Sequence, residues 1–223
     1  MEEKCFFCIL FILHPLPMKK LLSLIAVSAI FLLSCQKKVD NAQPVTPPVV
    51  NEPADTAPTV KEFIPYLILQ GQQYSNLNAF VRTSYEQLSF AVKFDSSAIY
   101  QTLIPSNQGD INKLYGFSDN NAQHHEFSAR FGWRWSKDSL RLFAYVYNNS
   151  QMSFKETGTV QIGTENSCSI KVAGDNYIFT LNETTLTMPR ASSTVRAEGY
   201  KLYPYFGGDE LAPHTICIWI KEL

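Results

Sequence analysis

The sequence has little excess of either charge and few of the motifs that identify an activity. Its 19 Lys and Arg residues nearly balance 20 Asp and Glu residues, so it lacks the basic character typical of nucleic-acid-binding proteins. It contains no HExxH, no pair of CxxC motifs, no Gly-x-Ser-x-Gly, no phosphate-binding glycine loop and no dinucleotide fingerprint. The sequence therefore does not indicate a zinc protease, a serine hydrolase or a nucleotide-binding enzyme.

Long apolar runs are scarce too. The charge-free run Leu21–Leu33 is shorter than the roughly 20 residues that a membrane-spanning helix needs. It has the length of a cleaved signal segment, which does not belong to the folded protein.

The first 35 residues resemble a bacterial lipoprotein signal. Met18-Lys19-Lys20 forms a basic start, and Leu32-Leu33-Ser34-Cys35 ends on the cysteine that this family acylates. The resemblance implies a true start at Met18, removal of the preceding signal, lipidation of Cys35 and attachment to a bilayer. An ordinary signal peptide or an anchor helix with an incidental cysteine is the alternative. Gln36-Lys37-Lys38 lacks the Asp that retains lipoproteins at the inner membrane, which favours the outer membrane, on its periplasmic or its cell-surface side.

Residues 36–60 are predicted to be a tether. They are rich in proline and contain no aromatic residue, so they cannot bury enough apolar surface to fold. An ordered arm along the domain is the alternative. Residues 61–223 have the length of one domain.

This domain is predicted to consist of strands separated by turns. The candidate strands alternate apolar with polar or small residues and are Val60–Leu69, Leu88–Phe94, Lys113–Phe117, Phe127–Trp135, Leu140–Tyr147, Gly158–Ile162, Ser167–Val172, Tyr177–Leu181, Thr184–Met188, Tyr200–Phe206 and Ile216–Ile220. Single helical turns are expected at Asp95–Tyr100 and Glu210–Ala212. The pattern predicts an all-β fold, an antiparallel β-sandwich of jelly-roll type. Cys168 and Cys217 are either a disulfide or two free thiols.

Two neighbouring strands suggest a binding face. If Phe127–Trp135 pairs with Leu140–Tyr147, their apolar sides share the core. The other side then collects arginines and aromatic rings, namely Arg130, Arg134, Arg141, Phe143, Tyr145 and Tyr147. Rings of this kind stack on sugar faces, and guanidinium groups bind carboxylates through two bonds, so this face is predicted to bind a glycan, especially an acidic one. The alternative is a second hydrophobic layer in which the arginines pair with acidic residues.

Two further stretches contain residues that could carry chemistry. His124 and His125 are adjacent in an expected strand, where they would point to opposite faces and could not share a metal, so no metal site and no cofactor is predicted. In the stretch Tyr200–His214, a strand ending in Gly207-Gly208 would bring Tyr203, Tyr205 and His214 near one rim. These three are the candidate catalytic residues if the protein is an enzyme. A tight turn and a capped strand end are the structural alternative.

The domain resembles a group of Bacteroidetes-type lipoproteins in its motifs Lys113–Asp119, Ser128–Trp135 and Tyr203–Glu210. It is more loosely similar to concanavalin-like jelly rolls, which include glycan-binding modules, glucanases and alginate-lyase-like enzymes. The alginate-lyase motifs Arg-x-Glu-Leu-Arg and Gln-Ile-His are absent. The predicted function is therefore glycan binding without catalysis by an outer-membrane-anchored lipoprotein. A polysaccharide lyase and a structural or adhesion subunit that contacts another envelope protein are the alternatives. No nucleic-acid partner is predicted.

Overall fold

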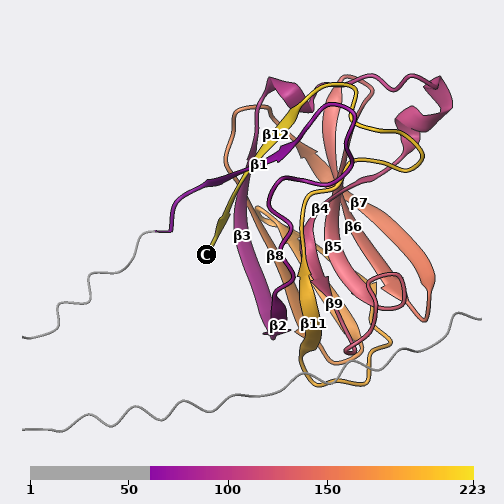
Figure 1. The fold of residues 1–223 in the computed structure, drawn as a ribbon. Helices are drawn as coiled ribbons and strands as arrows, with labels where there is room; N and C mark the ends of the chain where they lie inside the picture. Colours follow the sequence, from indigo (N-terminus) through magenta and orange to yellow (C-terminus); the bar gives the residue numbers. More distant parts are fainter. Residues whose placement is uncertain (1–60) are drawn as a thin grey trace, which may run out of the picture. The chain divides into compact units, whose positions relative to one another are not determined.

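The computed structural model describes residues 61–223, which form two antiparallel sheets packed face to face (Figure 1). The first sheet has the order β1-β12-β3-β8-β9-β10, and the second has the order β2-β11-β4-β5-β6-β7. The strands of the first sheet are β1 (Ile64–Ile68), β3 (Gln87–Phe94), β8 (Asn166–Ala173), β9 (Asn176–Leu181), β10 (Thr184–Pro189) and β12 (Ile216–Glu222). Those of the second are β2 (Arg82–Tyr85), β4 (Asn112–Ser118), β5 (Ser128–Ser136), β6 (Ser139–Asn148), β7 (Gln151–Val160) and β11 (Ala197–Leu202). The predicted antiparallel β-sandwich of jelly-roll type is confirmed.

Three predictions fall outside these residues. The signal at 1–35, the lipidation of Cys35 and the tether at 36–60 lie outside the described part of the chain and stay predictions. Within residues 61–223, no helix is long and apolar enough to span a membrane.

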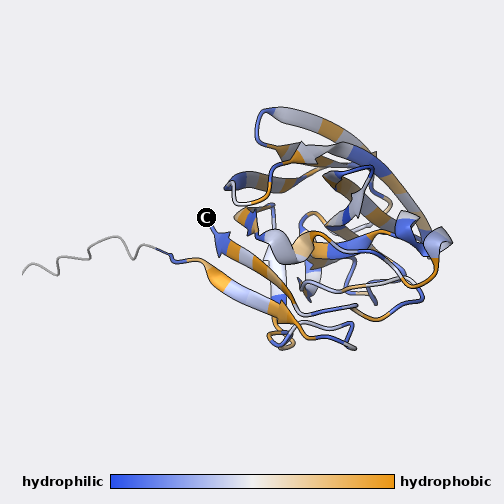
Figure 2. Cartoon of the chain, turned by 90° about the horizontal axis from the view of Figure 1, so that it is seen from above, coloured by the Kyte–Doolittle hydropathy of each residue, from blue (hydrophilic) through white to orange (hydrophobic). Residues whose placement is uncertain are grey.

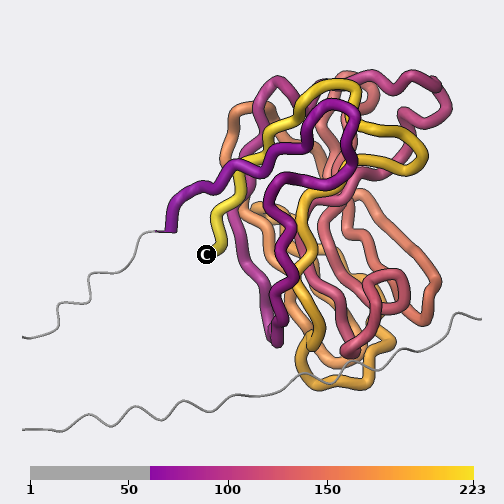
Figure 3. The backbone as a smooth tube through the Cα atoms, viewed as in Figure 1, coloured from indigo at the N-terminus to yellow at the C-terminus, as the bar shows by residue number. Residues whose placement is uncertain are grey.

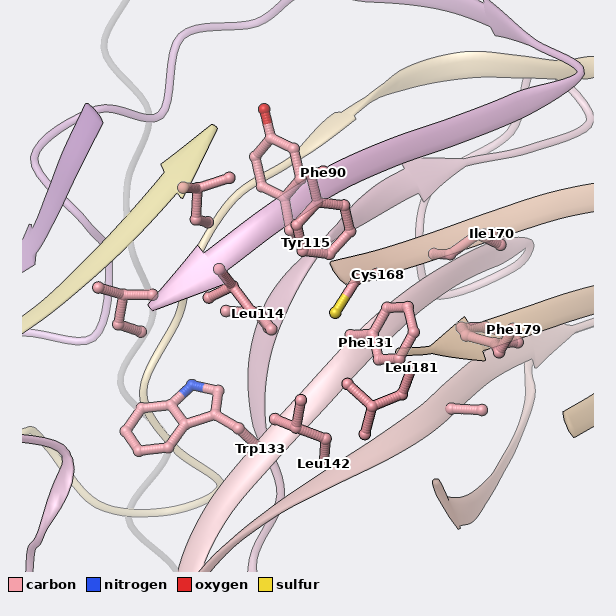
Figure 4. Close-up of a cluster of buried hydrophobic side chains, with 14 of the residues drawn as sticks. Phe90, Leu114, Tyr115, Phe131, Trp133, Leu142, Cys168, Ile170, Phe179 and Leu181 are labelled. Atoms are coloured by element: carbon pink, nitrogen blue, oxygen red, sulfur yellow. The ribbon is translucent and has the colours of Figure 1, made fainter. Parts of the chain in front are cut away.

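The core lies between the sheets because most strands alternate apolar and polar side chains, seen as orange and blue along the ribbons in Figure 2. Aromatic rings from both sheets meet there. Phe131 of β5 contacts Phe90 of β3 and Phe179 of β9, with ring centroids 5.8 Å and 5.2 Å away. Figure 4 shows these rings together with Trp133 and Leu142. Each fully buried ring contributes about 2 to 3 kcal/mol through removal of apolar surface from water.

The hairpin β5–β6 has the predicted register. Lys137 and Asp138, both at φ 53°, form a tight turn of the kind that suits the strand twist, and Arg130 pairs with Tyr145. Phe131 and Leu142 therefore face the core. The predicted set of arginines and aromatic rings lies on the opposite, outer side of the second sheet.

Two edge strands differ from the prediction. β2 was not predicted, and β7 was predicted at Gly158–Ile162 but runs Gln151–Val160. The first six residues of β7 are all exposed, although Met152 and Phe154 alternate with polar residues as in a half-buried strand.

The positions of the short helices also differ from the prediction. A 3₁₀ turn at Ser96–Ala98 lies inside the predicted segment, and another, at Pro105–Gly109, was not predicted. The turn expected at Glu210–Ala212 does not form. Instead, the Glu210 carboxylate accepts hydrogen bonds from the backbone N–H groups of Leu103 and Ile104, both at 2.8 Å.

The two cysteines of the domain are free thiols. Cys168 lies on β8 and Cys217 on β12, and β3 lies between these strands. Burial raises the pKa of the Cys168 thiol well above its usual range, so this sulfur is an inert part of the core.

A buried ionic cluster joins the two sheets at one end. Asp119, which follows β4, accepts hydrogen bonds from Arg190 at 2.8 Å and from Tyr177 of β9 at 2.6 Å. Burial alone would raise the pKa of Asp119, but these donors outweigh it and hold the pKa below its usual value. The cluster is structural, because each charge has its partner inside it.

Candidate functional site

A cleft of about 540 Å³ opens on the outer face of the second sheet. Its floor comes from β4, β5, β6 and β11, and one wall is the segment 74–80 that precedes β2. The cationic or titratable lining residues are Lys113, His124, His125, Arg130 and Lys201, and the aromatic ones are Tyr74, Phe80, Tyr145, Tyr147, Tyr200, Tyr203 and Tyr205. None of the described residues that line the cleft is an Asp or a Glu.

Arg130 is the central charge of the cleft. Its side chain projects from β5 and is only 6% exposed, and its guanidinium carbon lies 5.4 Å from the centre of the Tyr145 ring. Its Nε is buried without a hydrogen-bond partner, and among residues 61–223 no carboxylate forms an ion pair with it. Burial lowers the pKa of Arg130, but an arginine stays protonated in proteins. The structure thus holds a buried cation that has no anion of its own.

Lys113 adds a second charge from β4. Its Nζ donates to the carbonyl of Gly207 at 3.0 Å and lies 5.2 Å from the centre of the Tyr145 ring. Desolvation, followed by the nearby charge of Arg130, lowers the pKa of Lys113 to about 8. At neutral pH the lysine is charged, and an anion in the cleft would stabilise both cations.

A β-bulge brings Lys113 to this side of the sheet. The register of β4 against β5 shifts between Lys113 and Tyr115, so Leu114 and Tyr115 both face the core. Without the extra residue, Lys113 would share a face with Tyr115 and point inward.

A hydrogen-bonded His–Tyr pair lies at one end of the cleft. His124 Nδ1 is 2.8 Å from the Tyr200 hydroxyl oxygen. Desolvation, with the charges of Arg130 and His125, lowers the pKa of His124 to about 4. The imidazole is therefore neutral at physiological pH.

The expectation that His124 and His125 point to opposite faces was wrong. Residues 124–126 form a turn before β5, not a strand, and Glu126 N–H donates to the Gln123 carbonyl at 2.8 Å. In the turn, the two imidazole centres are 4.1 Å apart and both side chains line the cleft. Within residues 61–223, no three His, Cys, Asp or Glu side chains are grouped as a metal site would require.

The structure divides the predicted glycan-binding face. Arg130, Tyr145 and Tyr147 line the cleft, whereas Arg134, Arg141 and Phe143 do not. Arg141 pairs with Glu156 at 2.7 Å, and Phe143 is 2% exposed in a small apolar cluster, with Arg134 4.8 Å above its ring. Arg134, Arg141 and Phe143 therefore belong to a second packed layer, which was the alternative to a binding face.

The predicted catalytic residues are separated as well. Tyr203 and Tyr205 both line the cleft, and the Tyr203 ring also lies against Tyr66 and Tyr115. His214 does not line the cleft; its Nε2 lies 2.8 Å from the Ser97 carbonyl. The histidine that meets a tyrosine in the cleft is His124, and its partner Tyr200 stood in the predicted last-but-one strand. A turn assignment for 124–126 would have been needed to find this pair.

The similarity of this chain to known proteins lies in its fold. No family model and no curated protein matches the sequence. Among solved structures, the domain is similar to alginate lyase vAL-1 from a Chlorella virus, with 12% identity, 75% of this chain and 85% of that chain covered, and a TM-score of 0.44. It is also similar to a Bacteroides ovatus GH16 protein in complex with a glucan product (12% identity, 74% and 82% covered, TM-score 0.47) and to carbohydrate-binding module CBM66 from Bacillus subtilis (12%, 71% and 82%, TM-score 0.34). These values are too low to transfer any activity to this chain.

Proposed function

We propose that the domain binds acidic polysaccharide in the cleft, on a protein anchored to the outer membrane through Cys35. The observation that carries the proposal is Arg130, a buried guanidinium that has no anionic partner in the part of the chain that the structure describes. Leaving a charge buried and unpaired costs several kcal/mol, and a bound carboxylate would remove that cost with two parallel hydrogen bonds.

The rest of the lining favours a sugar over a simple inorganic anion. Tyr147 and Tyr205, which are both partly exposed, offer flat apolar faces together with hydroxyl groups, a combination suited to the apolar faces and hydroxyls of a pyranose. The cleft volume lies inside the range of about 300 to 1,000 Å³ typical of ligand sites. A uronic acid, which joins a carboxylate to a pyranose ring, satisfies both parts of the site.

The proposal can be tested with two matched arginine variants. Arg130→Met removes the cleft charge, and Arg141→Met removes a charge on the same face that is paired with Glu156. We expect the unmodified protein to bind members of a panel of acidic polysaccharides, including alginate and polygalacturonate, and not neutral glucans. Arg130→Met should lose at least about tenfold in affinity, the cost of one charge-assisted hydrogen bond, whereas Arg141→Met should not. Failure of the folded protein to bind any acidic polymer would refute the proposal.

A lyase is the second candidate, favoured by the His124–Tyr200 hydrogen bond beside Arg130. One member of the pair would take the proton from the carbon beside the carboxylate, and the electron pair would form a C=C bond as the neighbouring C–O bond breaks. The departing oxygen would take a proton from the other member. Arg130 would stabilise the charge that develops on the carboxylate.

The unsaturated product absorbs ultraviolet light, which makes the lyase testable on the same polymers. Absorbance should rise with the unmodified protein and with His214→Gln, and should stay flat with Tyr200→Phe and with His124→Gln. Binding without any rise in absorbance would leave a binding module and exclude the lyase.

A further inference from the structure

Two aromatic side chains on the wall of the cleft are exposed to an extent that folding does not explain. Tyr74 and Phe80 are 65% and 68% exposed, although both line the cleft. Each contacts a tyrosine of the cleft: Tyr74 meets Tyr205 edge-on, with ring centres 4.9 Å apart, and Phe80 meets Tyr200 at a tilt of 36°, with ring centres 5.2 Å apart. Each ring therefore keeps most of its surface available to a ligand.

The wall that carries these rings is fixed by backbone hydrogen bonds. Ser75 N–H donates to the Pro204 carbonyl at 3.2 Å, Asn76 N–H to the Leu67 carbonyl at 2.8 Å, and Lys201 N–H to the Val81 carbonyl at 2.9 Å. Figure 3 shows this stretch in purple, running beside the yellow chain of β11. A ring on such a wall is held in position before the ligand arrives, which lowers the entropic cost of binding.

The two rings lie on either side of Arg130 along the cleft. The register across β11, β4 and β5 places Leu202 level with Gly116, and Gly116 level with Arg130. Tyr200, which contacts Phe80, precedes Leu202 by two residues. Tyr205, which contacts Tyr74, follows Leu202 by three residues. In extended chain, the five residues from one tyrosine to the other span roughly 16 Å.

We infer that Tyr74 and Phe80 are stacking platforms for the sugars that flank the uronate bound at Arg130. The inference rests on the proposed function and specifies its ligand. The ligand is a linear acidic polysaccharide that lies along the cleft, with the carboxylate of an inner sugar on Arg130 and a sugar face against each exposed ring. The protein therefore recognises at least three consecutive sugars inside a chain, not a single terminal residue.

The test is a length series of alginate and polygalacturonate oligomers, from the monosaccharide to the hexasaccharide, measured by calorimetry. Affinity of the unmodified protein should rise with length up to at least the trisaccharide. Tyr74→Ala and Phe80→Ala should each weaken hexasaccharide binding roughly 2- to 12-fold, the range of one aromatic contact, and should flatten the rise with length. Neither variant should change the melting temperature by more than a few degrees, because both side chains are exposed.

Phe63→Ala is the matched control, since Phe63 is a partly exposed ring next to β1 of the other sheet and does not line the cleft. It should bind the hexasaccharide like the unmodified protein. Equal affinity for the disaccharide and the hexasaccharide, or hexasaccharide binding by Tyr74→Ala and Phe80→Ala that matches the control, would overturn the inference and leave the proposed function intact. Absence of binding to oligomers of every length would instead refute the proposed function.

Discussion

Arg130 and Arg190 are equally buried, each 6% exposed, but their surroundings differ. Arg190 donates to Asp119 and to the hydroxyls of Ser192 and Thr194. Among residues 61–223, Arg130 has no such partner. Arg190 stabilises the fold, whereas Arg130 is the residue that we propose binds the ligand.

This difference predicts opposite effects of the same substitution. Arg130→Met should raise the free energy of unfolding by about 1 kcal/mol or more, because it replaces an unpaired buried charge with an apolar side chain. Arg190→Met should lower it by about 3 to 5 kcal/mol, because it leaves the Asp119 carboxylate without its cation. Urea denaturation of both variants measures the two changes in the free energy of unfolding. A loss of stability in Arg130→Met would mean that the guanidinium has partners in the folded protein.

Lys113 predicts how binding depends on pH. Its lowered pKa of about 8 means that the amine is charged below pH 8 and neutral above it, while Arg130 and the ligand carboxylates keep their charge. Affinity for an acidic glycan should therefore fall as pH rises through about 8 or slightly higher, since a bound carboxylate raises the pKa of the amine. Loss of one charge-assisted bond corresponds to roughly tenfold.

Lys113→Met is the control for this dependence, measured by calorimetry between pH 6 and 10. It should bind more weakly than the unmodified protein at pH 6 and show no fall near pH 8. If the affinity of Lys113→Met falls with pH in parallel with that of the unmodified protein, another group causes the pH dependence.

At the scale of the elements, strand β4 connects the core to the cleft. Its bulge turns Lys113 outward, and its Gly116 lies tightly against β5. A Cβ at Gly116 would be 2.2 Å from the Ala129 carbonyl oxygen and 2.5 Å from the Arg130 Cα. The close approach of these two strands therefore sets the position of Arg130.

Gly116→Ala should push β5 away and affect both stability and binding. We expect a loss of about 1 to 3 kcal/mol in the free energy of unfolding, as for other overpacked sites, together with weaker binding of acidic glycan. Gly109→Ala is the control, because the nearest atom to its Cβ would be 4.0 Å away. Thermal melting and binding isotherms of the two variants test the prediction; unchanged binding by a destabilised Gly116→Ala would show that β5 does not position the site.

The elements also show what the sequence could and could not predict. Alternation along Phe127–Trp135 and Leu140–Tyr147 was enough to predict that Arg130, Tyr145 and Tyr147 share an outer face. It could not predict the bulge at Lys113, because one inserted residue changes the side of the sheet without changing the composition. It also could not reveal that Arg141 is paired with Glu156, since that contact depends on the register of β6 against β7, which shifts between Leu142 and Phe143.

At the scale of the whole molecule, the residues of the cleft come from distant parts of the chain. Tyr74 precedes β2, His124 lies in the turn between β4 and β5, and Tyr200 lies on β11. The sandwich brings them together through pairing of strands that are far apart in sequence. The fold class was predictable from local patterns, whereas the convergence of His124 on Tyr200, in place of His214, required the strand order.

The proposed anchor belongs to this scale and can be tested separately from ligand binding. Cys35→Ala, expressed in a diderm bacterium, should move the protein from the membrane fraction to the soluble fraction, and the protein should no longer incorporate labelled fatty acid. Loss of acylation is expected to have this effect because the acyl chains would provide the only predicted attachment to the bilayer. Retention of the variant in the membrane fraction would contradict a lipid anchor at this cysteine.

The unpaired charges of the cleft have a practical consequence for such measurements. A cationic cleft attracts whichever small anion is abundant, and phosphate or sulfate would compete with a carboxylate for the same guanidinium. Mobile ions also screen the field of the site, whose range is about 8 Å at 0.15 M ionic strength. The affinity of this protein for a charged polymer will therefore depend on the buffer anion and its concentration, so constants from different buffers can be compared only after that competition has been measured.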